Sequence, residues 1–153
     1  MTALPPKLAE IVELFQAARG REKLELLLEF AEAMPPLPEW LATNRDQMEF
    51  VHECQTPVYV AAENRDGLVF YFDVPKEAPT VRGYAGVLAE GLRGATPEQV
   101  LALPSDFFLP MGLAEVVSHQ RLNGMSAILA HMKRLALEHL PADKRSRPNG
   151  ASF

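Results

Sequence analysis

Two apolar segments joined by a tight turn constrain the fold of this chain more than any other feature. In residues 58–62, Val58, Val60 and Ala62 alternate with Tyr59 and Ala61, which is typical of a half-buried strand. A second apolar segment follows at residues 68–72. The segment between them contains Asn64-Arg65-Asp66-Gly67, in which Asp-Gly is a strong hairpin-turn pair. A shorter candidate strand lies at residues 48–51. The pattern predicts a small antiparallel sheet of about three strands, with helices covering one of its faces.

Helical periodicity describes most of the remaining chain. Near the N-terminus, apolar residues recur at intervals of three and four in two stretches, which predicts two helices that each bury one face. These residues are Leu8, Ile11, Val12 and Phe15 in the first stretch, and Leu24, Leu27, Leu28 and Ala31 in the second. We expect Gly20 to end the first helix and Thr80 to cap a later one. A capping box from Thr96 to Gln99 predicts a short helix, and a last helix is expected from Ser118 to about residue 140.

Prolines and polar residues mark the boundaries of the predicted domain. Pro35-Pro36-Leu37-Pro38 stops the second helix, and we interpret it as a rigid connector. Residues 1–140 are predicted to form a single α+β domain, in which the small sheet packs against several helices. Residues 141–153 are polar and contain Pro and Gly, so we expect a disordered tail.

Composition excludes several classes of function. The net charge of −5 argues against a general nucleic-acid-binding protein, which would need a basic face. No apolar run approaches the roughly 20 residues that span a bilayer, and no secretory signal is visible, so no membrane association is expected. A single cysteine without a secretion signal fits the reducing cytoplasm.

That single cysteine, Cys54, lies between the first and second predicted strands, and it is the candidate reactive residue. A lone cysteine forms no internal disulfide, but it can act as a nucleophile or carry a covalent adduct. The alternative is a buried small apolar residue, which is the common role of a free cysteine. The polar neighbours His52, Glu53, Gln55 and Thr56 favour the reactive role.

Two side chains are candidates for assisting the thiol. His52 is two residues from Cys54, so on an extended segment the two side chains share a face. Arg121, near the start of the last helix, could stabilise a thiolate by its charge. A solvated loop histidine and a surface ion pair are the alternatives for these two residues. Glu53 acts in the opposite direction, because a nearby negative charge raises a thiol pKa.

Other functions compete with a reactive thiol. A zinc or iron–sulfur site needs about four ligands, and His131 and His139 are eight residues apart, which does not make the usual helical ligand pair. We therefore expect no metal site and no cofactor. A small Cys–His thiol enzyme and a non-catalytic adaptor of a partner enzyme remain as alternatives.

Several segments, taken in order, resemble the SufE family of cysteine desulfurase accessory proteins. The resemblance covers roughly residues 4 to 140. It begins with two N-terminal helices and a proline-rich connector, and the matching sequence segments follow them. These segments are Cys54-Gln55-Thr56-x-Val58-Tyr59, Val81-Arg82-Gly83, Thr96-Pro97-Glu98, Gly112-Leu113 and Ser118-x-x-Arg121-x-Asn123-Gly124.

The resemblance implies a fold and a function. The fold would be a SufE-like α+β domain, similar to IscU-like iron–sulfur cluster scaffold proteins. Cys54 would accept a sulfur atom, as a persulfide, from a PLP-dependent cysteine desulfurase, and the chain would stimulate that enzyme. The sulfur would pass to a downstream Fe–S scaffold complex. The chain would then be an accessory protein of sulfur transfer more than a self-sufficient enzyme.

The sequence departs from the family pattern near the cysteine. Glu53 stands where the family usually has glycine, and Thr56 replaces a serine while keeping the hydroxyl. Ahead of Val81, Pro75 and Lys76 replace the usual small and acidic residues, and Glu77 occupies an acidic position. Arg82 and Arg121 match the family's basic positions.

Overall fold

The predicted sheet is present in the computed structural model, which describes residues 4–141. Its strands are β1 (Glu49–Phe50), β2 (Tyr59–Asn64) and β3 (Leu68–Asp73). They lie in the order β1-β2-β3, and both pairs are antiparallel. At the hairpin turn Asp66 and Gly67 have positive φ angles of 58° and 115°, which explains the preference for Asp-Gly there. The expectation of a small antiparallel sheet is confirmed.

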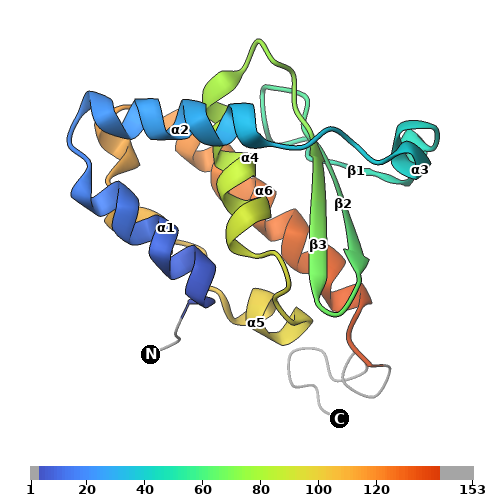
Figure 1. Ribbon diagram of the computed structural model, residues 1–153. Helices are drawn as coiled ribbons and strands as arrows, with labels where there is room; N and C mark the ends of the chain where they lie inside the picture. The colour runs from blue at the N-terminus through green and yellow to red at the C-terminus, as the bar shows by residue number, and fades with distance from the viewer. Residues whose placement is uncertain (1–3, 142–153) are drawn as a thin grey trace.

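Six α-helices and three short 3₁₀ turns surround this sheet within the described residues (Figure 1). The helices are α1 (Pro6–Ala17), α2 (Arg21–Ala33), α3 (Glu39–Ala42), α4 (Pro79–Gly91), α5 (Pro97–Ala102) and α6 (His119–Glu138). The turns are η1 (Arg45–Gln47), η2 (Leu109–Met111) and η3 (Leu113–Glu115). The capping box at the start of α5 and the start of α6 after Ser118 are both as predicted.

Helix α4 lies at the centre of the helical layer and contacts α1, α2, α6 and β3 (Figure 1). Two glycines permit its close approach to α2. A Cβ on Gly83 would lie 2.1 Å from the Leu27 carbonyl oxygen, and one on Gly86 would lie 2.6 Å from the Phe30 carbonyl oxygen. Glycine lowers helix propensity, so its use here reflects the packing of one backbone against another.

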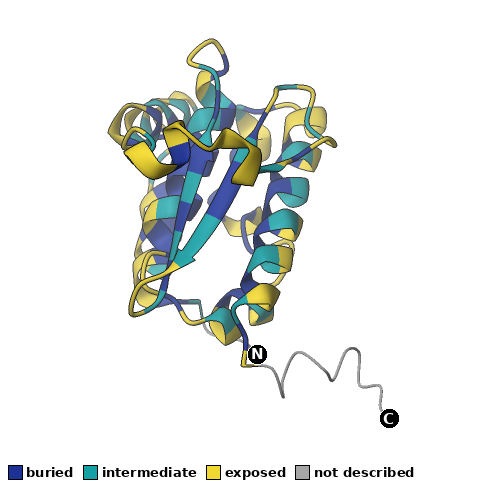
Figure 2. Cartoon of the chain, turned by 90° about the vertical axis from the view of Figure 1, so that its right-hand side faces the viewer, coloured by how far each residue is buried: buried dark blue, intermediate teal, exposed yellow. Residues whose placement is uncertain are grey.

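One face of the sheet carries the main core, and β3 alternates between buried and partly exposed residues (Figure 2). On β3 the buried residues are Leu68, Phe70 and Phe72, which join the apolar faces of the helices. The opposite face holds a smaller cluster in which Ala61 packs with Leu41 and Met48. The sheet is therefore fixed between two apolar layers of unequal size.

Two helix boundaries differ from prediction. Helix α1 ends at Ala17, and Gly20, with φ of 52°, precedes α2 instead of ending α1. Helix α4 begins at Pro79 and is preceded by Ala78, so Thr80 lies inside its first turn instead of capping it. Proline is favoured at the first helical position, which explains this start.

The predicted tail, residues 141–153, lies outside the described residues except for Pro141. None of the helices in residues 4–141 combines the length and the apolar character needed to cross a bilayer.

Candidate functional site

Cys54 lies on a loop whose two ends are anchored in the core. Val51 and Val58, one at each end, are fully buried, and the Val51 amide donates to the Val58 carbonyl at 2.9 Å. Within the loop, the Cys54 amide donates to the Val51 carbonyl at 3.3 Å. The loop is therefore closed at its base by the two strands. It places Cys54, which is half-buried, against α6.

The thiol of Cys54 rests against the first third of α6. Its Sγ donates to the Gly124 carbonyl at 3.4 Å, although the two residues are 70 positions apart. A Cβ on Gly124 would lie 3.2 Å from Sγ, so glycine leaves the space that the sulfur occupies. Burial raises the pKa of the Cys54 thiol, and the negative charge of Glu53 raises it further. Both effects favour the protonated form of the thiol.

A cavity of about 520 Å³ opens beside this thiol. The loop, the start of α6 and one residue of α4 line it. Its lining residues are Glu53, Cys54, Gln55, Thr56, Val81, Ser118, Gln120, Arg121, Asn123, Gly124 and Met125. Most are polar, so the cavity can admit water or a polar partner segment next to the sulfur.

Arg121 lines this cavity but its guanidinium is directed to α4. Its Nη1 donates to the Thr80 hydroxyl at 3.0 Å, while its amide donates to the Ser118 hydroxyl at 3.3 Å in the helix cap. The structure therefore brings Arg121 into the same cavity as Cys54, with Thr80 as its partner. Its side chain is exposed and borders the same cavity as the sulfur.

His52 belongs to a different group of side chains from Cys54. Its Nε2 lies 3.7 Å from a Glu53 carboxylate oxygen, and its ring meets the ring of His131 edge-on at 5.8 Å. His52 is not one of the described residues that line the cavity beside Cys54. The geometry thus gives no support to His52 as the base that deprotonates Cys54.

His131, for which helical spacing predicts no ligand role, is at the centre of that second group. Its Nε2 lies 2.8 Å from Glu53 Oε1, and its Nδ1 contacts the carboxylate of Glu49, which also pairs with Arg134. Burial tends to lower the pKa of His131, but its hydrogen bonds with the two carboxylates outweigh burial and raise it. The contact between α6 and β1 is therefore ionic. His131 lies outside the buried stripe of α6, so no local sequence pattern indicated this contact.

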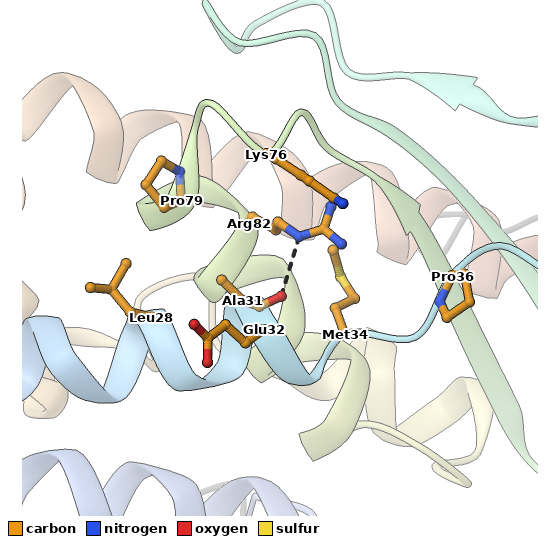
Figure 3. Close-up of a pocket in the computed structure, with 8 residues that line it drawn as sticks. All are labelled: Leu28, Ala31, Glu32, Met34, Pro36, Lys76, Pro79 and Arg82. Carbon is orange, nitrogen blue, oxygen red and sulfur yellow. Dashed lines mark hydrogen bonds between the residues drawn. The ribbon is translucent and has the colours of Figure 1, made fainter.

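Arg82, the other residue that matches a basic position of the family, hydrogen-bonds to the backbone of neighbouring segments. A larger cavity of about 650 Å³ lies between the end of α2 and the start of α4 (Figure 3). There Arg82 donates from Nε to the Ala31 carbonyl at 3.2 Å and from Nη1 to the Val74 carbonyl at 2.7 Å. Both hydrogen bonds join separate backbone segments, so Arg82 fastens α2 to the connection that precedes α4.

Comparison with known proteins agrees with this arrangement. The model of the family described as "SufE: Fe-S metabolism associated domain" matches residues 9–136. An uncharacterized SufE-like protein of Mycobacterium tuberculosis is 46% identical over 134 residues, covering 86% of this chain and 92% of that protein. A protein of Plasmodium vivax named "Cysteine desulfuration protein SufE" is 32% identical over 136 residues, covering 85% of this chain and 52% of that protein.

A solved structure is similar as well. The solution structure of a hypothetical protein from Thermus thermophilus aligns with a TM-score of 0.79 and 40% sequence identity. The alignment covers 89% of this chain and 97% of that one. The α+β arrangement is thus shared along nearly the whole of both chains.

Proposed function

Because this chain belongs to the SufE family, we propose that it is a sulfur carrier, which accepts a persulfide sulfur on Cys54 from a cysteine desulfurase. Membership of the family connects the chain with cysteine desulfuration and Fe–S metabolism. The finer role, sulfur acceptance together with stimulation of the desulfurase for iron–sulfur cluster assembly, is our proposal.

The position of Cys54 is the observation that carries this proposal. It is the only cysteine of the chain, and its sulfur borders a polar cavity of about 520 Å³. The loop presents the thiol at the end of the sheet, with the start of α6 on the other side of the cavity. A donor cysteine on a flexible partner segment can therefore reach the sulfur without unfolding the domain.

The transfer is an exchange reaction in which atoms and electrons balance. The Cys54 thiolate attacks the outer sulfur of the donor persulfide, and a new S–S bond forms while the donor's S–S bond breaks. The donor cysteine leaves as a thiolate and takes up the proton that Cys54 has lost. No external oxidant is needed, because the transferred sulfur keeps its oxidation state.

The nearby residues determine how readily this exchange starts. In the free protein the raised pKa favours the protonated thiol, which donates to the Gly124 carbonyl, so a docking partner must first break that hydrogen bond. Arg121 can then stabilise the thiolate or the leaving donor, if its guanidinium moves from Thr80 into the cavity.

The proposed partners follow from the same chemistry. The donor is a PLP-dependent cysteine desulfurase, which holds the cofactor, and the recipient is an Fe–S scaffold complex. The carrier itself needs no cofactor for an exchange between sulfur atoms. We propose the cytoplasm as its compartment, because a lone thiol stays reduced there.

Replacing Cys54 by serine tests the proposal. We expect Cys54→Ser to abolish stimulation of the desulfurase, because a hydroxyl holds no persulfide sulfur. The variant should keep its circular dichroism spectrum and still bind the desulfurase in a pull-down. Full stimulation by the folded variant would contradict the carrier mechanism and would favour an adaptor that acts on the desulfurase by binding alone.

A further inference from the structure

Three potential metal ligands meet beside the Cys54 loop, and one of them, Glu53, also borders the cavity. They are His52 and Glu53, both on the loop, and His131 on α6. One ligand atom from each lies within 4.8 Å of the other two. The two oxygens of Glu53 face different histidines: Oε1 lies 2.8 Å from His131 Nε2, and Oε2 lies 3.7 Å from His52 Nε2.

These spacings suit a small divalent ion. In a tetrahedral zinc site with ligand distances of about 2.0–2.2 Å, neighbouring ligand atoms are about 3.3–3.6 Å apart. The separation from His131 is below that range, and the separation from His52, made by the other Glu53 oxygen, is just above it, so binding through one oxygen requires the exposed side chains of His52 and Glu53 to rotate. Two imidazole nitrogens and one carboxylate oxygen form a ligand set that zinc accepts, with the fourth position left to water.

A further carboxylate orients the central histidine. His131 contacts Glu49 through Nδ1, which leaves Nε2 directed at the other two ligands. Glu49 is held in turn by Arg134, whose Nε donates to it at 3.0 Å, and the side chains of His131 and Glu49 are only 13% and 14% exposed. A carboxylate on the far nitrogen of a ligand histidine fixes its tautomer and its orientation in known metal sites.

We propose that His52, Glu53 and His131 bind one divalent transition-metal ion of the zinc type, which replaces the proton between His131 Nε2 and Glu53, releases it to solvent, and ties the Cys54 loop to α6. Cys54 is not a ligand, because its thiol is directed to the Gly124 carbonyl and borders the cavity instead. This proposal does not rest on the sulfur-carrier function. Helical spacing does not reveal it, because its ligands come from a loop and a helix about 80 residues apart in the sequence.

Cobalt(II) provides the most direct test, because its visible absorption reports both coordination geometry and ligand type. Titration of the full chain with Co²⁺ should show one equivalent bound with tetrahedral absorption, displaced by Zn²⁺. It should show no sulfur-to-cobalt charge-transfer band, and Cys54→Ser should bind equally well. Such a band, or loss of binding in Cys54→Ser, would overturn the proposed ligand set.

Four variants separate this site from adventitious binding. His52→Gln and Glu53→Gln change exposed residues, so they should keep the fold and lose the tetrahedral signal. Glu49→Gln should weaken Co²⁺ binding by about 10- to 100-fold, the usual effect of removing a supporting carboxylate. The matched control is His119→Gln, an exposed histidine at the start of α6, which should bind as the wild type does. Unchanged binding in His52→Gln and Glu53→Gln would overturn the proposal.

Hydrogen exchange tests whether the ion joins the loop to the helix. Adding Zn²⁺ should slow amide exchange in residues 52–54, because an ion held between the loop and α6 opposes opening. The effect should be absent in His52→Gln. Saturation with Zn²⁺ without any slowing would contradict the bridging role.

Discussion

At the scale of single residues, Glu53 opposes the chemistry of the cysteine that follows it. Burial and the Glu53 charge together raise the pKa of the Cys54 thiol. We predict that Glu53→Gln lowers this pKa, since the repulsion between carboxylate and thiolate disappears while burial remains. The rate of alkylation by iodoacetamide should then follow a pH profile displaced to lower pH. At neutral pH the variant should react faster, because more of its thiol is ionised.

The matched control for this change is Glu10→Gln, which removes the same charge from an exposed position on α1. Its alkylation profile should coincide with that of the wild type. If Glu53→Gln also coincided with the wild type, the charge of Glu53 would have no effect on the thiol, and burial alone would account for the raised pKa.

At the scale of elements, the contact between α4 and α2 depends on glycine. A Cβ at position 83 would lie 2.1 Å from a backbone oxygen of α2, which no side-chain rotation can relieve. We predict that Gly83→Ala lowers the free energy of unfolding by about 1–3 kcal/mol, the usual cost of overpacking. Urea denaturation, followed by circular dichroism, measures it.

Gly124→Ala is the control within another helix. There the nearest atom is the movable sulfur of Cys54, at 3.2 Å, so the change in unfolding free energy should stay within about 1 kcal/mol. Equal losses in both variants would show that the approach of α4 to α2 is not the determining factor.

At the scale of the whole molecule, the half-buried thiol on the loop contacts α6, and its labelling rate tests whether loop and helix separate. We predict that a bulky thiol reagent labels Cys54 more slowly in the folded chain than in urea, compared at equal thiolate fraction. A closed loop favoured by about 1.4 kcal/mol would slow labelling about tenfold. Adding the desulfurase, with its own cysteine blocked, should speed labelling. Equal rates in the folded and unfolded chains would rule out a sheltered thiol.

The elements of this molecule were more predictable from the sequence than its site. The hairpin at Asp66-Gly67, the capping box at Thr96 and the start of α6 depend on local patterns, and all were predicted. The contact of Cys54 with Gly124 joins residues 70 positions apart, which no local period encodes.

Side-chain partners were less predictable for the same reason. Arg121 was a candidate for assisting the thiol, but its partner Thr80 becomes evident only when α4 and α6 are placed side by side. Likewise, His131 looked isolated because helical spacing compares it only with residues of its own helix. The roles assigned to Cys54, Arg121 and His52 stay predictions.

Mass spectrometry of the chain after incubation with a cysteine desulfurase and cysteine tests the central claim most directly. Under non-reducing conditions the peptide that contains Cys54 should gain the mass of one or more whole sulfur atoms, and a reductant should remove the gain. The same peptide from Cys54→Ser should gain none. If the desulfurase carries its own persulfide while Cys54 of the wild-type chain gains no sulfur, the chain is not a sulfur carrier.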